Sequence, residues 1–134
     1  MTVLPGQPYP DRPAWEDLSP MLFNGWGVPG EAQNLQAFVD GNTVTIFGRV
    51  QIGASTHAMV IPEHMEPIRQ ASLDALILRG PTCQMEIRTH PSNGRWNLFL
   101  SGYALNLSGA EMLEKYAGMY VSIRGSYPRR MPTT

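Results

Sequence analysis

The fold class of this 134-residue chain is decided by the stretch Asp40-Gly41-Asn42-Thr43-Val44-Thr45-Ile46-Phe47-Gly48-Arg49-Val50. Asp40-Gly41 suits the positive φ angle of a tight hairpin turn, and the residues after it alternate between apolar and polar side chains. Such alternation is typical of a strand with one buried face. Gly48 stands in the apolar row, so we expect another backbone or a bulky ring, such as Trp26 or Trp15, to pack over it.

Further segments on both sides of this hairpin have the composition of short elements. We expect strands over residues 37–39, 44–52, 57–61, 72–78, 83–88, 95–100 and 119–127. The segment 72–78 alternates only at its start, so its pattern also fits a short helix, and we expect a strand. Ser108 and Glu111 have the spacing of a capping box and predict a short helix or helical loop near residues 109–117. Seven or eight strands in about 115 residues predict an all-β fold, an antiparallel, jelly-roll-like β-sandwich.

The chain length fits one domain with a flanking segment at each end. Residues 1–14 carry four prolines, which favour an extended, polyproline-like arm. Residues 15–127 hold the sandwich pattern, and residues 128–134 form a tail. Thirteen glycines and twelve prolines indicate many turns and exclude long helices.

The composition narrows the functional classes. With 43% hydrophobic and 16% charged residues and a net charge of −1, the chain is neither a disordered acidic protein nor a basic nucleic-acid binder. The pair Arg129-Arg130 is too small for a nucleic-acid tail, and we expect it to contact a neighbouring protein or solvent. The single cysteine, Cys83, is expected to be a small buried hydrophobe. We find no secretory signal and no apolar run long enough to span a membrane, so folding is expected in a cytoplasm.

No residue pattern predicts catalysis or a cofactor. The histidines His57, His64 and His90 lack the spacing of metal ligands, and we interpret them as solvated loop residues. A nucleophile elbow, a phosphate-binding glycine loop and a paired set of catalytic carboxylates are also missing from the sequence. We therefore expect no enzyme, no metal and no cofactor.

Several motifs follow one another in a fixed order along residues 15–127. They are Trp15 with Leu18, Asn24-Gly25-Trp26, Gly41 with Val44 and Gly48, Pro62 with Pro67, and the aromatic-rich segment 119–127. In this order and spacing the chain resembles the head domain that ends many bacteriophage tail-fibre and minor tail proteins. The resemblance implies a homotrimeric β-sandwich on the outside of a virion, with no enzymatic activity.

The resemblance also implies roles for individual residues. The candidates for fold or trimer-interface positions are Trp15, Leu18, Asn24, Gly25, Trp26, Gly41, Val44, Gly48, Pro62 and Pro67. We expect Trp15 and Trp26 to pack in the core or between subunits, since aromatic residues within such patterns usually pack. Trp96, after the turn at residues 91–94, is the candidate ligand contact. In the arm, Leu4, Pro8, Tyr9 and Pro10 are expected to contact neighbouring virion proteins.

Three functions remain as alternatives. The first is a minor tail, tail-tip or receptor-binding subunit, with other tail proteins and a host cell-surface glycan as partners and without contact to nucleic acid or membrane. The second is a capsid decoration protein of the same fold, whose arm lies across the major capsid protein. The third, from a different class, is a free carbohydrate-binding module. The first two imply a place on the virion exterior after assembly in the host cytoplasm.

Overall fold

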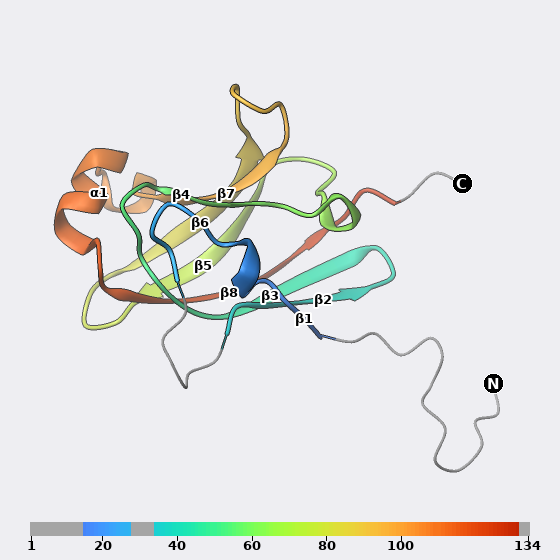
Figure 1. Cartoon of the computed structure of the whole chain (residues 1–134), viewed down its shortest axis with the longest axis horizontal. Coiled ribbons are helices and arrows are strands. Elements are labelled where there is room, and N and C mark those ends of the chain that lie inside the picture. The colour runs from blue at the N-terminus through green and yellow to red at the C-terminus, as the bar shows by residue number, and fades with distance from the viewer. Residues whose placement is uncertain (1–14, 28–33, 132–134) are drawn as a thin grey trace, which may run out of the picture.

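The computed structural model of the protein describes residues 15–27 and 34–131, which form one curled antiparallel sheet with a short helix at one end (Figure 1). The strand order across the sheet is β1-β2-β3-β8-β5-β6-β7-β4. The strands are β1 (Trp15–Asp17), β2 (Gln36–Asp40), β3 (Thr43–Gln51), β4 (His57–Val60), β5 (Ala71–Ile77), β6 (Thr82–Thr89), β7 (Trp96–Ser101) and β8 (Tyr120–Pro128). The other elements are helix α1 (Gly109–Tyr116) and the 3₁₀ turns η1 (Ser19–Met21), η2 (Glu63–Met65) and η3 (Tyr103–Leu105).

The predicted all-β fold with one short helix is confirmed, and the predicted element ends differ from the observed ones by at most one residue. The ambiguous segment 72–78 forms β5, because pairing with β6 and β8 satisfies its backbone on both sides. The capping box is also present: the Glu111 amide donates to Ser108 Oγ at 3.2 Å, and the Ser108 amide donates to Glu111 Oε1 at 3.0 Å. The bond from the Ser108 amide to the Glu111 carboxylate is the main cause that holds the pKa of Glu111 below its ordinary value. Strand β1 was not predicted, because three residues are too few to show a period.

The predicted two-sheet sandwich is not confirmed, because β8 joins both halves of the molecule into one sheet. β8 pairs with β3 along all nine residues of that strand, and residues 121–124 of β8 pair with β5 on the other side. Because β8 pairs on both sides, all the described strands belong to one continuous hydrogen-bonded sheet. The sheet curls instead, and its inner face encloses the core.

The hairpin between β2 and β3 forms as its sequence indicates. Asp40 pairs with Thr43, so Gly41 and Asn42 make a two-residue turn. Gly41 has a φ of 59°, the positive value required at the first central position of a type II′ turn. The alternation in β3 then turns the predicted core residue Val44 inward, where it is fully buried, and leaves Phe47 on the outer face.

Gly48 is covered by backbone, which is one of the two alternatives that the sequence indicated. Its φ is 149°, and a Cβ at this position would lie less than 3.0 Å from the Asn34 carbonyl and the Leu35 Cα. This gap is too narrow for a side chain, so the expected cover by Trp26 or Trp15 is wrong. The chain entering β2 crosses directly over β3 at this point.

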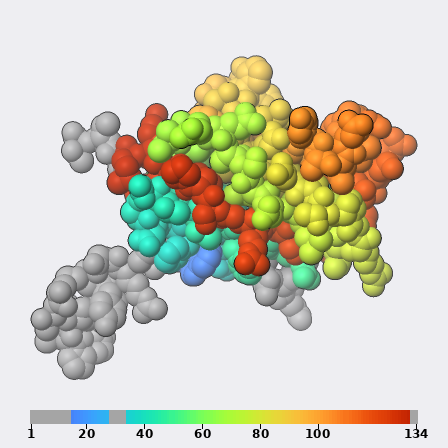
Figure 2. All heavy atoms as spheres, turned by 180° about the vertical axis from the view of Figure 1, so that it is seen from behind, coloured from blue at the N-terminus to red at the C-terminus, as the bar shows by residue number. Residues whose placement is uncertain are grey.

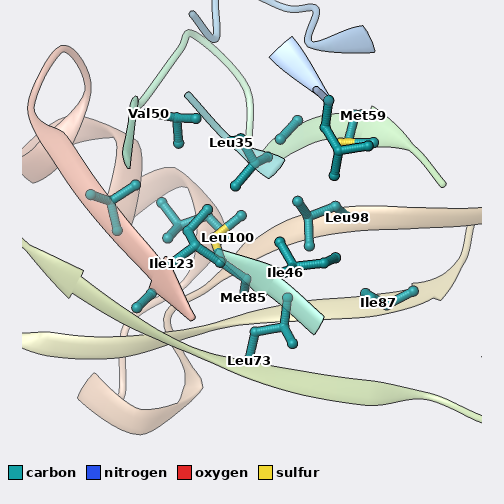
Figure 3. Close-up of a cluster of buried hydrophobic side chains, with 14 of the residues drawn as sticks. Leu35, Ile46, Val50, Met59, Leu73, Met85, Ile87, Leu98, Leu100 and Ile123 are labelled. Carbon is teal, nitrogen blue, oxygen red and sulfur yellow. The ribbon is translucent and has the colours of Figure 1, made fainter. Parts of the chain in front are cut away.

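The core consists of apolar side chains from every part of the curled sheet (Figure 3). Figure 3 shows Ile46, Leu73, Met85, Leu98 and Ile123 pointing toward one another from five strands. Curling allows this arrangement, because strands at opposite ends of the ladder then face the same interior. Each such side chain contributes roughly 1.5–3 kcal/mol by leaving water. The predicted burial of Cys83 is confirmed at 2% exposure, and burial raises the pKa of its thiol.

Residues 18–27, which we call the strap, connect the two ends of the sheet. They follow β1 directly, and their Phe23 amide donates to the Ala58 carbonyl of β4 at 3.0 Å. Ala58 lies at an irregularity in the β4–β7 register, where residues 57 and 59 pair with successive residues of β7. The strap thus covers part of the β4 edge, which would otherwise present free backbone groups to other chains.

The two arginines after β8 both bind within the fold: Arg129 is half-buried, whereas Arg130 is exposed to solvent, as expected, while it pairs with Glu66. Arg129 donates through Nε to the Gly41 carbonyl at 2.7 Å and through Nη1 to the His64 carbonyl at 2.9 Å. Arg130 forms an ion pair with Glu66 at 2.6 Å. Together they fasten the β2–β3 turn and the loop between Pro62 and Pro67 to the end of β8.

Replacing Gly48 with alanine tests the backbone crossing. We expect Gly48→Ala to lower the free energy of unfolding by about 3 kcal/mol, because the new Cβ forces apart two backbone segments at a positive φ. Urea denaturation followed by tryptophan fluorescence would measure the change. Gly94→Ala is the matched control, since Gly94 has a φ of 65° but no atom within 4 Å of an added Cβ, and it should cost about 1 kcal/mol. Equal losses for both variants would contradict the crossing.

Candidate functional site

The outer face of the sheet carries an apolar cluster, which we call the outer patch and define as Trp15, Phe38, Phe47 and Leu76. Trp15, Phe47 and Leu76 are 50%, 41% and 53% exposed. The outward positions of Phe38, Phe47 and Leu76 follow from strand alternation, because each neighbours residues whose side chains enter or pack against the core. Trp15 pairs directly with Phe38 on the same face. In Figure 2 the red band of β8 lies at the surface beside the teal atoms of the β2–β3 hairpin, so this face is open to solvent.

The aromatic members of the outer patch contact one another across three strands. Trp15 of β1 lies directly opposite Phe38 of β2, with ring centroids 5.2 Å apart. The Trp15 and Phe47 centroids are 6.4 Å apart. These distances are within the range of favourable aromatic pairs, so the three rings form one preorganised surface rather than separate exposed groups.

A hollow of about 460 Å³ extends the outer patch across β3, β8 and β5. Its wall combines apolar side chains with Asp74, which pairs in register with Arg124. Both charged residues are exposed, and neither forms a side-chain hydrogen bond or ion pair with another described residue. The side chains that line it and point outward are Phe47, Asp74, Leu76, Thr82, Ser122 and Arg124.

A second cluster, which we call the ring stack, crosses the outer face of β6, β7 and β4. The Arg88 guanidinium lies 4.4 Å from the Phe99 ring centroid, and the Phe99 ring stacks on His57 at 4.8 Å. His57 in turn meets the edge of Phe23 at 4.7 Å and stacks on His90 at 5.0 Å. Phe99 is only 6% exposed because these neighbours cover it.

A fully buried asparagine, Asn97, supports the ring stack. Its Nδ2 donates to the Arg95 carbonyl at 2.7 Å and to Asn93 Oδ1 at 3.1 Å. Since a carbonyl only accepts, this arrangement fixes Nδ2 and turns Oδ1 toward Asn93 Nδ2, at 3.1 Å, and His57 Nε2, at 2.6 Å. Asn97 therefore joins the strand β4 to the β6–β7 turn, residues 90–95.

The surroundings of His57 disfavour its protonated form. Burial lowers the pKa of His57, the hydrogen bond that His57 donates to Asn97 opposes this change, and the nearby His90 adds to it. The interpretation of the three histidines as solvated loop residues is therefore wrong for His57, which lies in β4 and is hydrogen-bonded. His64 is exposed on η2 and binds Glu16 of β1 at 2.8 Å.

The predicted Asn24-Gly25-Trp26 motif forms a turn in the strap. Asn24 and Gly25 have φ angles of 56° and 83°, and the Trp26 amide donates to the Phe23 carbonyl at 3.0 Å. The Asn24 side chain donates to the His57 carbonyl at 2.9 Å. Trp26 is 5% exposed, and its indole nitrogen donates to a backbone carbonyl before β4 at 2.7 Å.

The other predicted positions are distributed over the core and the surface. Leu18 and Pro67 are buried, and Pro62 is half-buried. Trp15 lies on the surface rather than in the core, because β1 is an edge strand whose outer face has no cover among the described residues. Trp96, the candidate ligand contact, is half-buried and packs against the core. The arm residues Leu4, Pro8, Tyr9 and Pro10 lie outside the described residues.

Reasoning from the sequence missed the ring stack. Alternation along single strands places Arg88, His57 and Phe99 on outer faces, and this signal was present in the sequence. Their contact depends on the pairing of β6 with β7 and of β7 with β4, which a single strand pattern does not specify. The buried role of Asn97 had no sequence signal.

Neither cluster has the composition of a metal centre. Within residues 15–27 and 34–131, no group of three or more histidine, cysteine or acidic side chains is placed to hold a metal ion. In the same part of the chain, no helix is long and apolar enough to cross a membrane.

Comparison with known protein families found no matching family model, and a search among curated proteins found no match.

Replacing Asn97 with leucine tests the support of the ring stack. We expect Asn97→Leu to lower the free energy of unfolding by about 3 kcal/mol, because it leaves the Arg95 carbonyl and the His57 imidazole without their buried partner. Asn93→Ala removes only the exposed side of the same network and should cost about 1 kcal/mol. Thermal and urea denaturation would measure both losses. A loss below that of Asn93→Ala would contradict a central role for Asn97.

Proposed function

We propose that the protein is a non-enzymatic structural protein of a tailed bacteriophage, a homotrimer on the exterior of the virion at the tail tip. In this proposal it acts as a minor tail or receptor-binding subunit. The order of motifs along residues 15–127 supports the phage family, because the chain resembles tail-fibre head domains in that order. The outer patch is the single structural observation that supports an assembled state.

The outer patch has the properties of a surface that another protein covers. Monomeric proteins seldom expose connected groups of large apolar side chains, and such groups mark interaction sites. Trp15, Phe38 and Phe47 contact one another before any partner binds, so little side-chain entropy is lost when they are covered. Aromatic residues are also the type that dominates binding energy in protein interfaces.

The hollow beside the outer patch supports a second copy of the chain as the partner. In a ring of three subunits, one surface of each copy meets a different surface of the next copy. The β1–β2 side of the outer patch offers the rings of Trp15 and Phe38. The hollow, which begins at Phe47, offers a recess with one acidic and one basic side chain, Asp74 and Arg124, without a described partner. A neighbouring copy in such a ring would supply groups for both charges and cover Leu76.

Replacing Phe47 with arginine tests the proposed interface. Wild-type protein is expected to elute with light-scattering mass near three times 14.9 kDa, and Phe47→Arg near 14.9 kDa, since a buried unpaired charge disrupts the contact. Size-exclusion chromatography with light scattering measures both masses. Tyr103→Arg is the matched control, because Tyr103 is 86% exposed on η3, outside the outer patch, and this variant should remain trimeric.

The two parts of the proposal are separable by experiment. A monomeric wild-type protein, both in solution at about 50 μM, well above the dissociation constant of a stable interface, and on the particle, would contradict the trimer. A trimeric Phe47→Arg protein would contradict the outer patch as its interface. Electron microscopy of intact particles labelled at the carboxyl terminus tests the location. Label at the tail tip is the expected result, whereas label over the capsid shell would replace it with the capsid decoration function.

A further inference from the structure

We propose that the ring stack is an acid-sensitive latch, which holds the strap and the β6–β7 turn on the sheet while its stacked imidazole rings are neutral and releases them when protons are added to the stack. This inference does not depend on the proposed virion function. It rests on the stacking, on the direction of the hydrogen bonds and on the charges around the two rings.

His57 connects the strap to the rest of the sheet. On one side its ring meets the edge of Phe23 of the strap, and its backbone carbonyl accepts a hydrogen bond from the side-chain amide of Asn24. On the other side it stacks on Phe99 and donates through Nε2 to Asn97. Any change that displaces the His57 ring therefore acts on the strap and on the buried Asn97 network together.

The hydrogen bonds define the neutral form of both histidines. His57 Nε2 must carry the proton, because Asn97 turns its Oδ1 acceptor toward it. His90 Nδ1 must be bare, because the Ser92 backbone amide donates to it at 3.0 Å and the Ser92 hydroxyl lies 2.6 Å away. A proton added at His90 Nδ1 would place two donors against each other, because the Ser92 backbone amide can only donate a hydrogen bond. Protonation of His90 therefore breaks the bonds that shape the β6–β7 turn.

Charge around the two rings makes double protonation unfavourable. The rings are 5.0 Å apart, so two imidazolium groups would repel each other. The surrounding elements supply two cations and one carboxylate: β6 carries Arg88 and Glu86, the β6–β7 turn carries Arg95, and the strap and β7 carry no charged side chain. Neither histidine forms an ion pair within the described residues, where the one histidine–carboxylate pair is His64 with Glu16.

Attraction between a protonated His57 and Phe99 does not offset this repulsion. A cation gains energy over an aromatic face, but Arg88 already lies over the Phe99 ring. The pKa of His57 is accordingly lowered from its ordinary value of 6.5, with burial as the main cause. A lowered pKa in the folded state means that the unfolded chain binds the proton more strongly. The stabilisation is therefore complete above about pH 6.5 and is lost as the pH falls through the folded-state pKa.

Hydrogen exchange at two pH values tests the latch directly. After correction for the intrinsic pH dependence of exchange, amides of residues 22–27 and 91–95 are expected to exchange about tenfold faster relative to those of β3 and β8 at pH 5 than at pH 7.5. The double variant His57→Gln, His90→Asn keeps a donor in place of Nε2 and an acceptor in place of Nδ1 but does not titrate. It should change by less than about twofold over the same range. His64→Gln is the matched control and should behave as the wild type.

The outcomes separate the latch from general acid destabilisation. Equal acceleration in the wild type and the double variant would overturn the proposal, as would acceleration of all strands alike. If the double variant does not fold, measurements on the wild-type protein alone test the latch. Histidine side-chain NMR across the same range is then expected to show His57 taking up a proton together with the loss of strap protection. Titration without any loss of protection would reject the latch.

Discussion

The pairing of β3 with β8 along nine residues holds the two halves of the molecule together, and most other features depend on its register. A shift by one residue would turn Val44, Ile46 and Val50 to the outer face and bring Phe47 into the core. The inward side chains of β3 and β8 meet those of β5, β6 and β7 only in the observed register. Gly48 fits the same constraint, because the crossing of residues 34 and 35 leaves no room for a side chain at its inward position.

The sequence predicts local structure well where one strand or helix carries the whole signal. The hairpin at Gly41 and the capping box at Ser108 depend on neighbouring residues, and both form as predicted. The single curled sheet depends on β8 pairing with both β3 and β5, which no local pattern reveals. For the same reason the sequence left open whether Trp15 packs in the core or between subunits: its burial within the chain depends on whether another element covers the edge of the sheet. The ring stack was missed because its members lie on three segments far apart in the chain: the strap, β4 and the β6–β7 hairpin.

The outer face of the sheet divides into two regions with different chemistry. Around β1, β2 and β3 it presents contacting aromatic rings, next to a hollow with one acid and one base. Around β6, β7 and β4 the rings are covered by histidine and arginine side chains, and a buried asparagine fixes their orientation. The first region is suited to being covered by protein, whereas the second stabilises the molecule's own closure through the strap. Assembly and closure thus use separate surfaces.

The central place of β8 has a consequence for the time at which the protein folds. Residues 120–128 leave the ribosome after all the other strands, yet they pair on both sides in the middle of the sheet. Until they arrive, β3 and β5 are two open edges with apolar inner faces, a condition that favours pairing between chains. The nascent chain therefore cannot complete its core until residues 120–128 have left the ribosome. When several ribosomes translate one messenger RNA, neighbouring nascent chains expose these edges at the same time. The fold is therefore most vulnerable to aggregation before β8 has been synthesised, while nascent copies lie close together.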